Sequence, residues 1–74
     1  MSIGENIKLL RAENGLTQEE LSKKVGISRP MLAQIERGTK TVTLPIGKLI
    51  AEVFGCSVDD LVNDDKRVLN DGKA

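Results

Sequence analysis

The side chains with the clearest chemical potential lie between residues 28 and 37. Wound as a helix at about 100° per residue, this segment places the apolar Leu32 and Ile35 on one side and polar or small residues on the other. Arg can hydrogen-bond to both acceptors of a guanine edge, and Gln can pair with adenine in a similar two-point manner. Arg29 and Gln34 provide these groups on the polar side. The sequence therefore predicts a surface that reads DNA bases, made of Ser28, Arg29, Pro30, Ala33 and Gln34.

A second set of hydrogen-bond donors flanks this surface. Gln18 stands where the preceding helix is expected to begin, and exposed backbone N–H groups at such an end favour anions. Beyond residue 37 the chain continues into a loop rich in Thr and Lys. Donors of this kind hold a protein on the DNA backbone without reading sequence. The residues expected to contact phosphates are Gln18, Arg37, Thr39, Lys40, Thr41 and Thr43.

The sequence has few residues suited to metal binding, disulfide formation or catalysis. The 74 residues include no His and one Cys, Cys56, so neither a tetrahedral metal site nor an internal disulfide is predicted. Asp59 and Asp60 could form an acid–base pair, but their place in the first turn of a helix explains them equally well. No pair of nucleophile and base is visible. An enzyme is therefore the least favoured interpretation, and no cofactor or small-molecule ligand is expected.

Local signals divide the chain into short helices. Thr17 and Glu20 have the spacing of a capping box, and Ser57 and Asp60 repeat it. Ser28 and Thr43 are each followed two residues later by a Pro, which is typical of a capped helix beginning. Glycines placed to end helices occur at positions 15, 26, 38 and 55. Because no strand-like alternation of any length occurs, the predicted fold class is all-α.

Gly47 lies inside the predicted fourth helix. A glycine there costs about 1 kcal/mol of helix stability relative to Ala. The space beside it could be filled by Ile46, Leu49 or Phe54, or it could admit a partner chain. The geometry of any dimer therefore stays open.

Charge is unevenly distributed along a chain that has 11 basic and 11 acidic residues. Residues 29–48 contain four basic residues with Glu36 as the only acid, whereas residues 49–65 contain acids and no base. This predicts a basic side and an acidic side.

A chain this short buries little surface, which favours a homodimer. It has neither an export signal nor a long apolar run, so we expect a cytoplasmic protein with no membrane partner.

Three motifs in order resemble the Cro/C1-type (XRE) helix-turn-helix family. They are Leu-Thr-Gln-Glu-Glu-Leu at 16–21, Val-Gly-Ile-Ser-Arg at 25–29 and Ile-Glu-Arg-Gly at 35–38. The resemblance spans residues 3–62. It implies a compact five-helix, repressor-type (lambda repressor-like) DNA-binding domain at residues 1–63, with a polar tail at 64–74. It further implies a structural ion pair between Arg11 and Glu36.

The resemblance implies a sequence-specific regulator of transcription that binds double-stranded DNA at the nucleoid. Such a repressor-type protein places recognition helices in the major grooves of a palindromic operator as a homodimer. An antitoxin or a restriction–modification controller would bind DNA equally well. A protein-interaction module that does not bind DNA is the alternative from a different class.

Overall fold

The computed structural model describes residues 2–62, which form five helices and no strand. The helices are α1 (Ile3–Glu13), α2 (Gln18–Val25), α3 (Arg29–Arg37), α4 (Leu44–Phe54) and α5 (Val58–Val62). This confirms the all-α class and the five helices expected from the sequence. The polar tail expected at residues 64–74 lies outside the described residues.

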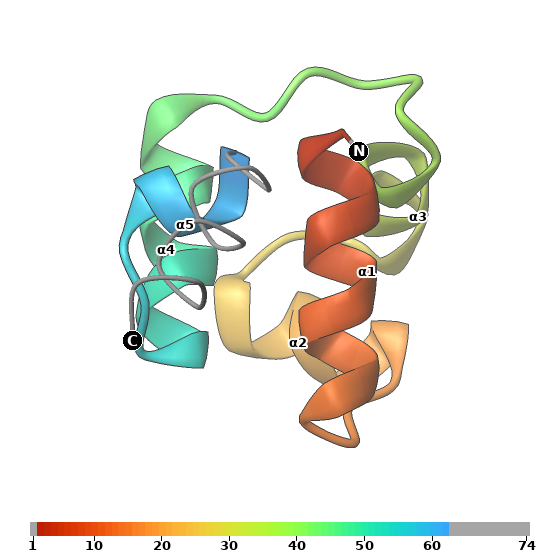
Figure 1. The fold of residues 1–74 in the computed structure, drawn as a ribbon. Coiled ribbons are helices and arrows are strands. Elements are labelled where there is room, and N and C mark those ends of the chain that lie inside the picture. The colour runs from red at the N-terminus through yellow and green to blue at the C-terminus, as the bar shows by residue number, and fades with distance from the viewer. Residues whose placement is uncertain (1, 63–74) are drawn as a thin grey trace.

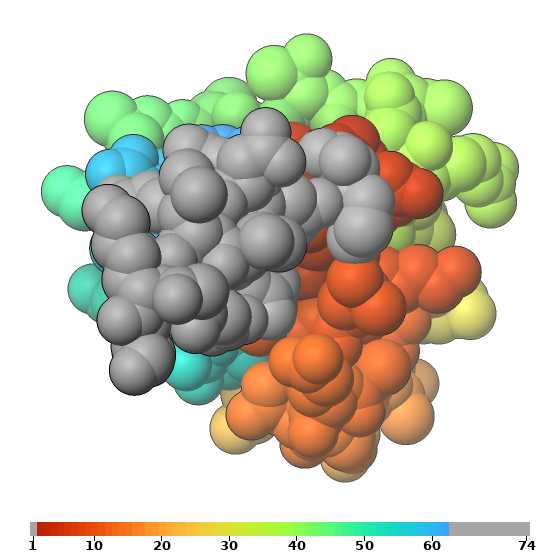
Figure 2. Space-filling model, viewed as in Figure 1, coloured from red at the N-terminus to blue at the C-terminus, as the bar shows by residue number. Residues whose placement is uncertain are grey.

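Helix α1 lies between two parts of the molecule. It packs against α3 on one side and against α5 on the other, while α2 contacts both α3 and α4 (Figure 1). The loop from residue 38 to 43 passes the N-terminal end of α1 on its way from α3 to α4, and Figure 2 shows this loop at the upper rim of the molecule. Helix α3 and the pair α4–α5 therefore occupy opposite sides of α1.

Local capping determines where most helices begin and end. Thr17 Oγ1 accepts a hydrogen bond from the Glu20 N–H, and Glu20 Oε1 accepts one from the Thr17 N–H, as the capping box predicts. Hydrogen bonds from Thr17 lower the pKa of Glu20, because they favour its ionised form. Gly26 and Gly38 end α2 and α3 with φ of 87° and 89°, a left-handed conformation that suits glycine.

The two Pro-containing helix beginnings differ from each other. Ser28 Oγ accepts a hydrogen bond from the Met31 N–H at 3.2 Å, so it caps α3 as expected. Thr43 occupies the same position before α4 but forms no capping hydrogen bond through its side chain. The expectation that Thr43 caps its helix in the way of Ser28 is therefore wrong. Its backbone has the extended conformation of an N-cap residue, so the difference lies in the hydroxyl alone.

The core is made of aliphatic side chains from all five helices. Ile7 of α1, Leu21 of α2, Leu32 and Ile35 of α3, Ile50 of α4 and Leu61 of α5 are at most 1% exposed. Burial of one such side chain is worth about 1.5–3 kcal/mol. The helical spacing of apolar residues on one face of α3 is thus confirmed, because Leu32 and Ile35 point inward while Arg29 and Gln34 are exposed.

Three positions show how closely the helices approach. A Cβ added to Gly4 would lie 2.1 Å from the Ile35 carbonyl oxygen, so α1 touches the backbone of α3 there. The buried Asn6 donates from Nδ2 to the Leu61 carbonyl at 2.7 Å and joins α1 to α5. Beside Gly47, the side chain within contact distance is Val42 of the loop rather than Leu49 or Phe54.

Candidate DNA interface

The outward face of α3 presents the side chains predicted to read bases. Arg29, Pro30 and Gln34 are exposed, and Ala33 is half-buried between them and the core. Ser28 stands at the beginning of the same helix, where its Oγ accepts the Met31 N–H. Because that bond uses a lone pair, the hydroxyl hydrogen stays available to a ligand. The five residues thus share one surface, and their contact with bases stays a prediction.

A buried carboxylate joins this helix to the rest of the motif. Glu36 has a side chain 4% exposed, and both of its oxygens accept hydrogen bonds from Arg11. The Arg11 Nε–Glu36 Oε2 distance is 2.7 Å, and Arg11 Nη2 lies 3.1 Å from Oε1. Arg11 also donates through Nη1 to the Leu16 carbonyl at 2.9 Å. The expected ion pair is present, and it ties α1 to α3 and to the turn before α2.

Gln18 joins the same network. Its Nε2 donates to Glu36 Oε1 at 3.0 Å, which fixes one N–H of the amide and leaves the other free to donate elsewhere. The sequence pattern indicated Gln18 as a phosphate contact but missed this bond, because the two residues are 18 positions apart. The start of α2 and the end of α3 are therefore held together by a side chain that also faces the candidate interface.

One groove brings together residues from both helices of the motif. Its lining is Gln18 of α2, Lys8 of α1 and four residues of α3, which are Arg29, Ala33, Glu36 and Arg37. Its volume is about 390 Å³. Lys8 was not among the residues predicted from the sequence. The negative charge of Glu36 faces Arg11 at 2.7 Å, so its opposition to an incoming phosphate is reduced.

The loop residues form a separate group. Thr39, Lys40 and Thr41 line a groove with Ile3 and Val62, away from Gln18 and Arg29. Both donors of Thr39 are engaged within α3, since its N–H and its hydroxyl bond to the Gln34 carbonyl at 3.0 and 3.3 Å.

The other loop donors are available. Across residues 2–62, the hydroxyls of Thr41 and Thr43 have no hydrogen-bond partner. Lys40 is exposed and forms no ion pair within the same residues. The loop can therefore offer two hydroxyls and one ammonium to an anion, whereas Thr39 would first have to give up an internal bond.

Charges on the candidate interface are free for a ligand. Among the described residues, the ion pairs are Arg11–Glu36 and the exposed Lys23–Glu19 at 3.4 Å. Arg29 and Arg37 are exposed and belong to neither pair. Arg is well suited to bidentate bonding with phosphates and guanine because its guanidinium is planar and always charged.

Two further kinds of site are not found in the described part of the chain. No group of three or more His, Cys, Asp or Glu is placed to hold a metal ion there. No helix of that part has the length and apolar character needed to cross a membrane.

Comparison with known proteins identifies the family. A helix-turn-helix family model, HTH_3, matches residues 7–61. The antitoxin PezA of Streptococcus pneumoniae is 44% identical over 64 residues, which are 86% of this chain and 40% of the antitoxin. An uncharacterized HTH-type transcriptional regulator of Archaeoglobus fulgidus is 40% identical over 63 residues, which are 84% of this chain and 90% of the regulator.

The fold of this chain is also similar to that of a solved structure. The phage P22 c2 repressor, in complex with a synthetic operator, superimposes with a TM-score of 0.82 at 28% sequence identity. The match covers 88% of this chain and 98% of the repressor chain. In contrast, this chain spans less than half of the antitoxin it resembles. The matched family model, the archaeal regulator and the repressor fold agree that the chain belongs to the Cro/C1-type helix-turn-helix family of DNA-binding transcriptional regulators.

Proposed function

We propose that this protein is a sequence-specific transcriptional repressor that binds a palindromic operator as a homodimer. The observation that carries the proposal is the two-sided character of α3, whose Leu32 and Ile35 are buried while Arg29 and Gln34 are exposed. A helix of this kind enters the major groove with its polar side toward the bases. Occupancy of the operator would then exclude other proteins from the same DNA, at the nucleoid in the cytoplasm.

Base recognition is assigned to the exposed side of α3. Arg29 would donate to guanine O6 and N7, and Gln34 would pair with adenine N6 and N7. Pro30 and Ala33 are compact, so they permit close approach and offer apolar contact to a thymine methyl group. The hydroxyl of Ser28 supplies a further donor at the beginning of the helix.

Phosphate contacts are assigned to the residues on either side of α3. Gln18 and Arg37 line the groove beside the reading surface, and Lys40, Thr41 and Thr43 continue along the loop. Thr39 belongs to the same proposal, at the cost of its 3.3 Å bond to the Gln34 carbonyl. Each neutralised phosphate makes binding more dependent on salt, with a slope of about −0.9 in log K against log salt.

A homodimer follows from the geometry of operators. Two recognition helices must enter successive major grooves about 34 Å apart, which one copy of α3 cannot do. Support for a second copy comes from Leu49 of α4 and Val62 of α5, which are 43% and 50% exposed. They lie on the helices that occupy the other side of α1 from α3 (Figure 1).

The test is a selection of bound duplexes from a random pool at two salt concentrations. Enrichment of an inverted repeat with half-sites about one helical turn apart is expected. Gln34→Ala and Arg29→Ala should each relax the preference at one base position and lose about 1–3 kcal/mol of specific binding. Lys24→Ala, on the exposed surface of α2, is the matched control and should select the same motif as the wild type.

Two results would contradict the proposal. If Gln34→Ala selected the wild-type motif unchanged, the reading surface would be misplaced. If no duplex were enriched although the helices were intact by circular dichroism, a protein-interaction module would be the better interpretation.

A second candidate, the DNA-binding part of an antitoxin, is favoured by the 44% identity to PezA. Its distinguishing result is a stable complex with the product of a neighbouring gene whose expression alone arrests growth.

A further inference from the structure

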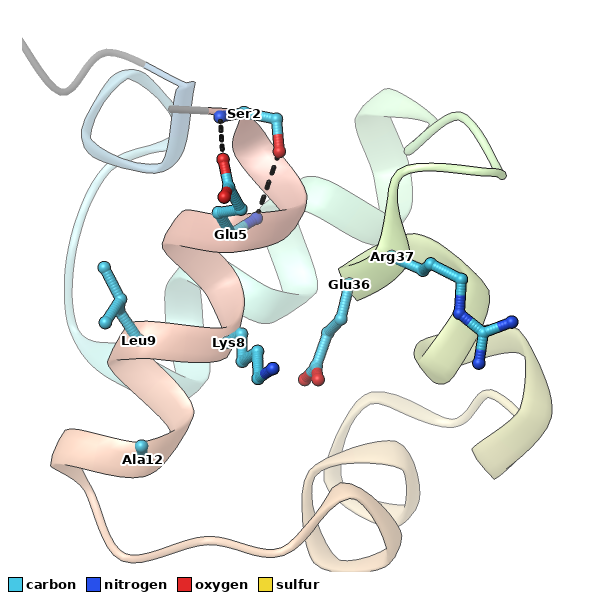
Figure 3. A pocket seen from close by; sticks show the side chains of 7 residues that line it. All are labelled: Ser2, Glu5, Lys8, Leu9, Ala12, Glu36 and Arg37. Carbon is cyan, nitrogen blue, oxygen red and sulfur yellow. Dashed lines mark hydrogen bonds between the residues drawn. The ribbon is translucent and has the colours of Figure 1, made fainter.

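The groove beside the reading surface has one cation that the helix-turn-helix pattern does not account for. Its lining consists of Gln18 from α2, four residues of α3 and Lys8 from α1. Lys8 also lines a second groove, along the outer side of α1, and there it meets Glu36 and Arg37 again. In Figure 3 the Lys8 side chain leaves α1 in the direction of the Glu36 carboxylate and the end of α3. Lys8 therefore stands where the two grooves join.

Within the described residues, no acid pairs with the charge of Lys8. The nearest acid along α1, Glu5, accepts a hydrogen bond from the Ser2 backbone N–H at 3.0 Å and completes the capping box of that helix (Figure 3). Glu36 receives three hydrogen bonds from Arg11 and Gln18. Both carboxylates close to Lys8 are thus occupied by other donors.

The groove is consequently a positive surface. Lys8, Arg29 and Arg37 surround it, while the one acid in its lining is buried and paired. A concentration of unpaired cations attracts a polyanion. Among polyanions, duplex DNA is favoured here because Gln18 and Arg29 in the same groove already belong to the proposed interface. This step rests on the proposed function.

We propose that Lys8 contacts a DNA phosphate, so that α1 takes part in the interface and the DNA backbone passes along this groove. The contact adds affinity without sequence preference, because an ammonium on a flexible stem interacts with phosphate as a point charge. One more neutralised phosphate steepens the salt dependence by about 0.9 in log K against log salt. With no contribution from the contact at about 1 M salt, this slope corresponds to about eightfold tighter binding at about 0.1 M.

The experiment compares Lys8→Gln and Lys8→Arg with the matched control Lys24→Gln, which removes the same charge from a lysine that lines neither groove. The probes are a mixed-sequence duplex of about two helical turns and the operator found by selection, each titrated over a range of salt. Lys8→Gln should bind both duplexes about eightfold more weakly at about 0.1 M salt, with a slope smaller by about one. Lys8→Arg should keep the wild-type slope.

The outcomes separate the two proposals. If the wild type binds duplex DNA and Lys8→Gln keeps its slope, the contact by Lys8 is refuted and the proposed function stands. If Lys8→Gln weakens binding to the operator alone, the role of Lys8 is base recognition and the phosphate contact is also refuted. If the wild type shows no salt-sensitive binding to either duplex, both proposals fail. Urea unfolding of each variant is the control for folding. Both substitutions should leave the free energy of unfolding unchanged, because Lys8 and Lys24 are exposed.

Discussion

Helix α1 meets α3 through close backbone contact and a polar network in addition to the shared apolar core, whereas α4 leaves room at Gly47 for a methyl group. At Gly4 a Cβ would come within 2.1 Å of a carbonyl oxygen of α3, while at Gly47 it would lie 3.7 Å from a methyl group of Val42. Arg11 and Glu36 add directional bonds to the first joint. On α4, Leu44 and Leu49 are 66% and 43% exposed. The joint with little freedom is the one that orients α3, the helix proposed to read bases.

The largest expected effect comes from breaking the polar part of the α1–α3 joint. Glu36→Ala leaves Nε and Nη2 of Arg11 and the amide of Gln18 without their acceptor. Removal of one partner of a buried ion pair costs about 3–5 kcal/mol, because the remaining charge is desolvated and unpaired. Urea denaturation followed by circular dichroism should show this loss in the free energy of unfolding.

The matched control for this loss is an exposed ion pair of the same kind. Glu19→Ala removes a carboxylate 3.4 Å from Lys23, with both side chains more than half exposed. An exposed pair in a helix contributes about 0.3–0.5 kcal/mol. If Glu36→Ala and Glu19→Ala destabilised the protein equally, the polar network would not be what holds α1 to α3.

The backbone part of the same joint should respond to a single methyl group. Gly4→Ala would place its Cβ against the carbonyls of Ile35 and Glu36, and neither α1 nor α3 can move without disturbing the core around Ile7. Overpacking of this kind costs about 1–3 kcal/mol and sometimes more. The loss should appear in the unfolding midpoint. A stability equal to that of the wild type would mean that the two helices can separate freely.

The same substitution on α4 should have the opposite sign. Gly47→Ala puts a methyl group at ordinary contact distance from Val42, in a helix where Gly is about 1 kcal/mol less favourable than Ala. We expect a gain of about 0.5–1 kcal/mol, which raises the melting temperature by several degrees in a domain of this size. A thermal melt of the two Gly→Ala variants side by side tests the comparison directly, and destabilisation by both would refute it.

Local signals account for what the sequence predicted well. Thr17 and Glu20 form a capping box, and glycines end α2 and α3. Each of these features involves residues within four positions of each other, so it can be predicted from the sequence alone. The ion pair of Arg11 and Glu36 was implied only by family resemblance. The exposed side of α3 followed from helical spacing, which fixes the direction of Arg29 and Gln34 once Leu32 and Ile35 are buried.

Other contacts between distant positions were not predicted. The Asn6 bond to Leu61 joins residues 55 positions apart, and an Asn on a helix carries no local sign of burial. The approach at Gly4 depends on where α3 ends in space. The spacing of Lys8 places it off the apolar face of α1, which by itself predicts only a solvent-exposed side chain. Its place in the groove emerged only after α1 and α3 were packed together.

The beginnings of α3 and α4 share one sequence pattern but differ in their capping bonds. Ser28→Ala removes the acceptor of the Met31 N–H and should cost about 1 kcal/mol. Thr43→Ala removes a hydroxyl that makes no capping bond, so the stability of α4 should change by less than about half of that. Unfolding midpoints of both variants give the comparison. Equal losses would mean that Thr43 caps α4 in solution after all, and its hydroxyl would then be less available to a phosphate.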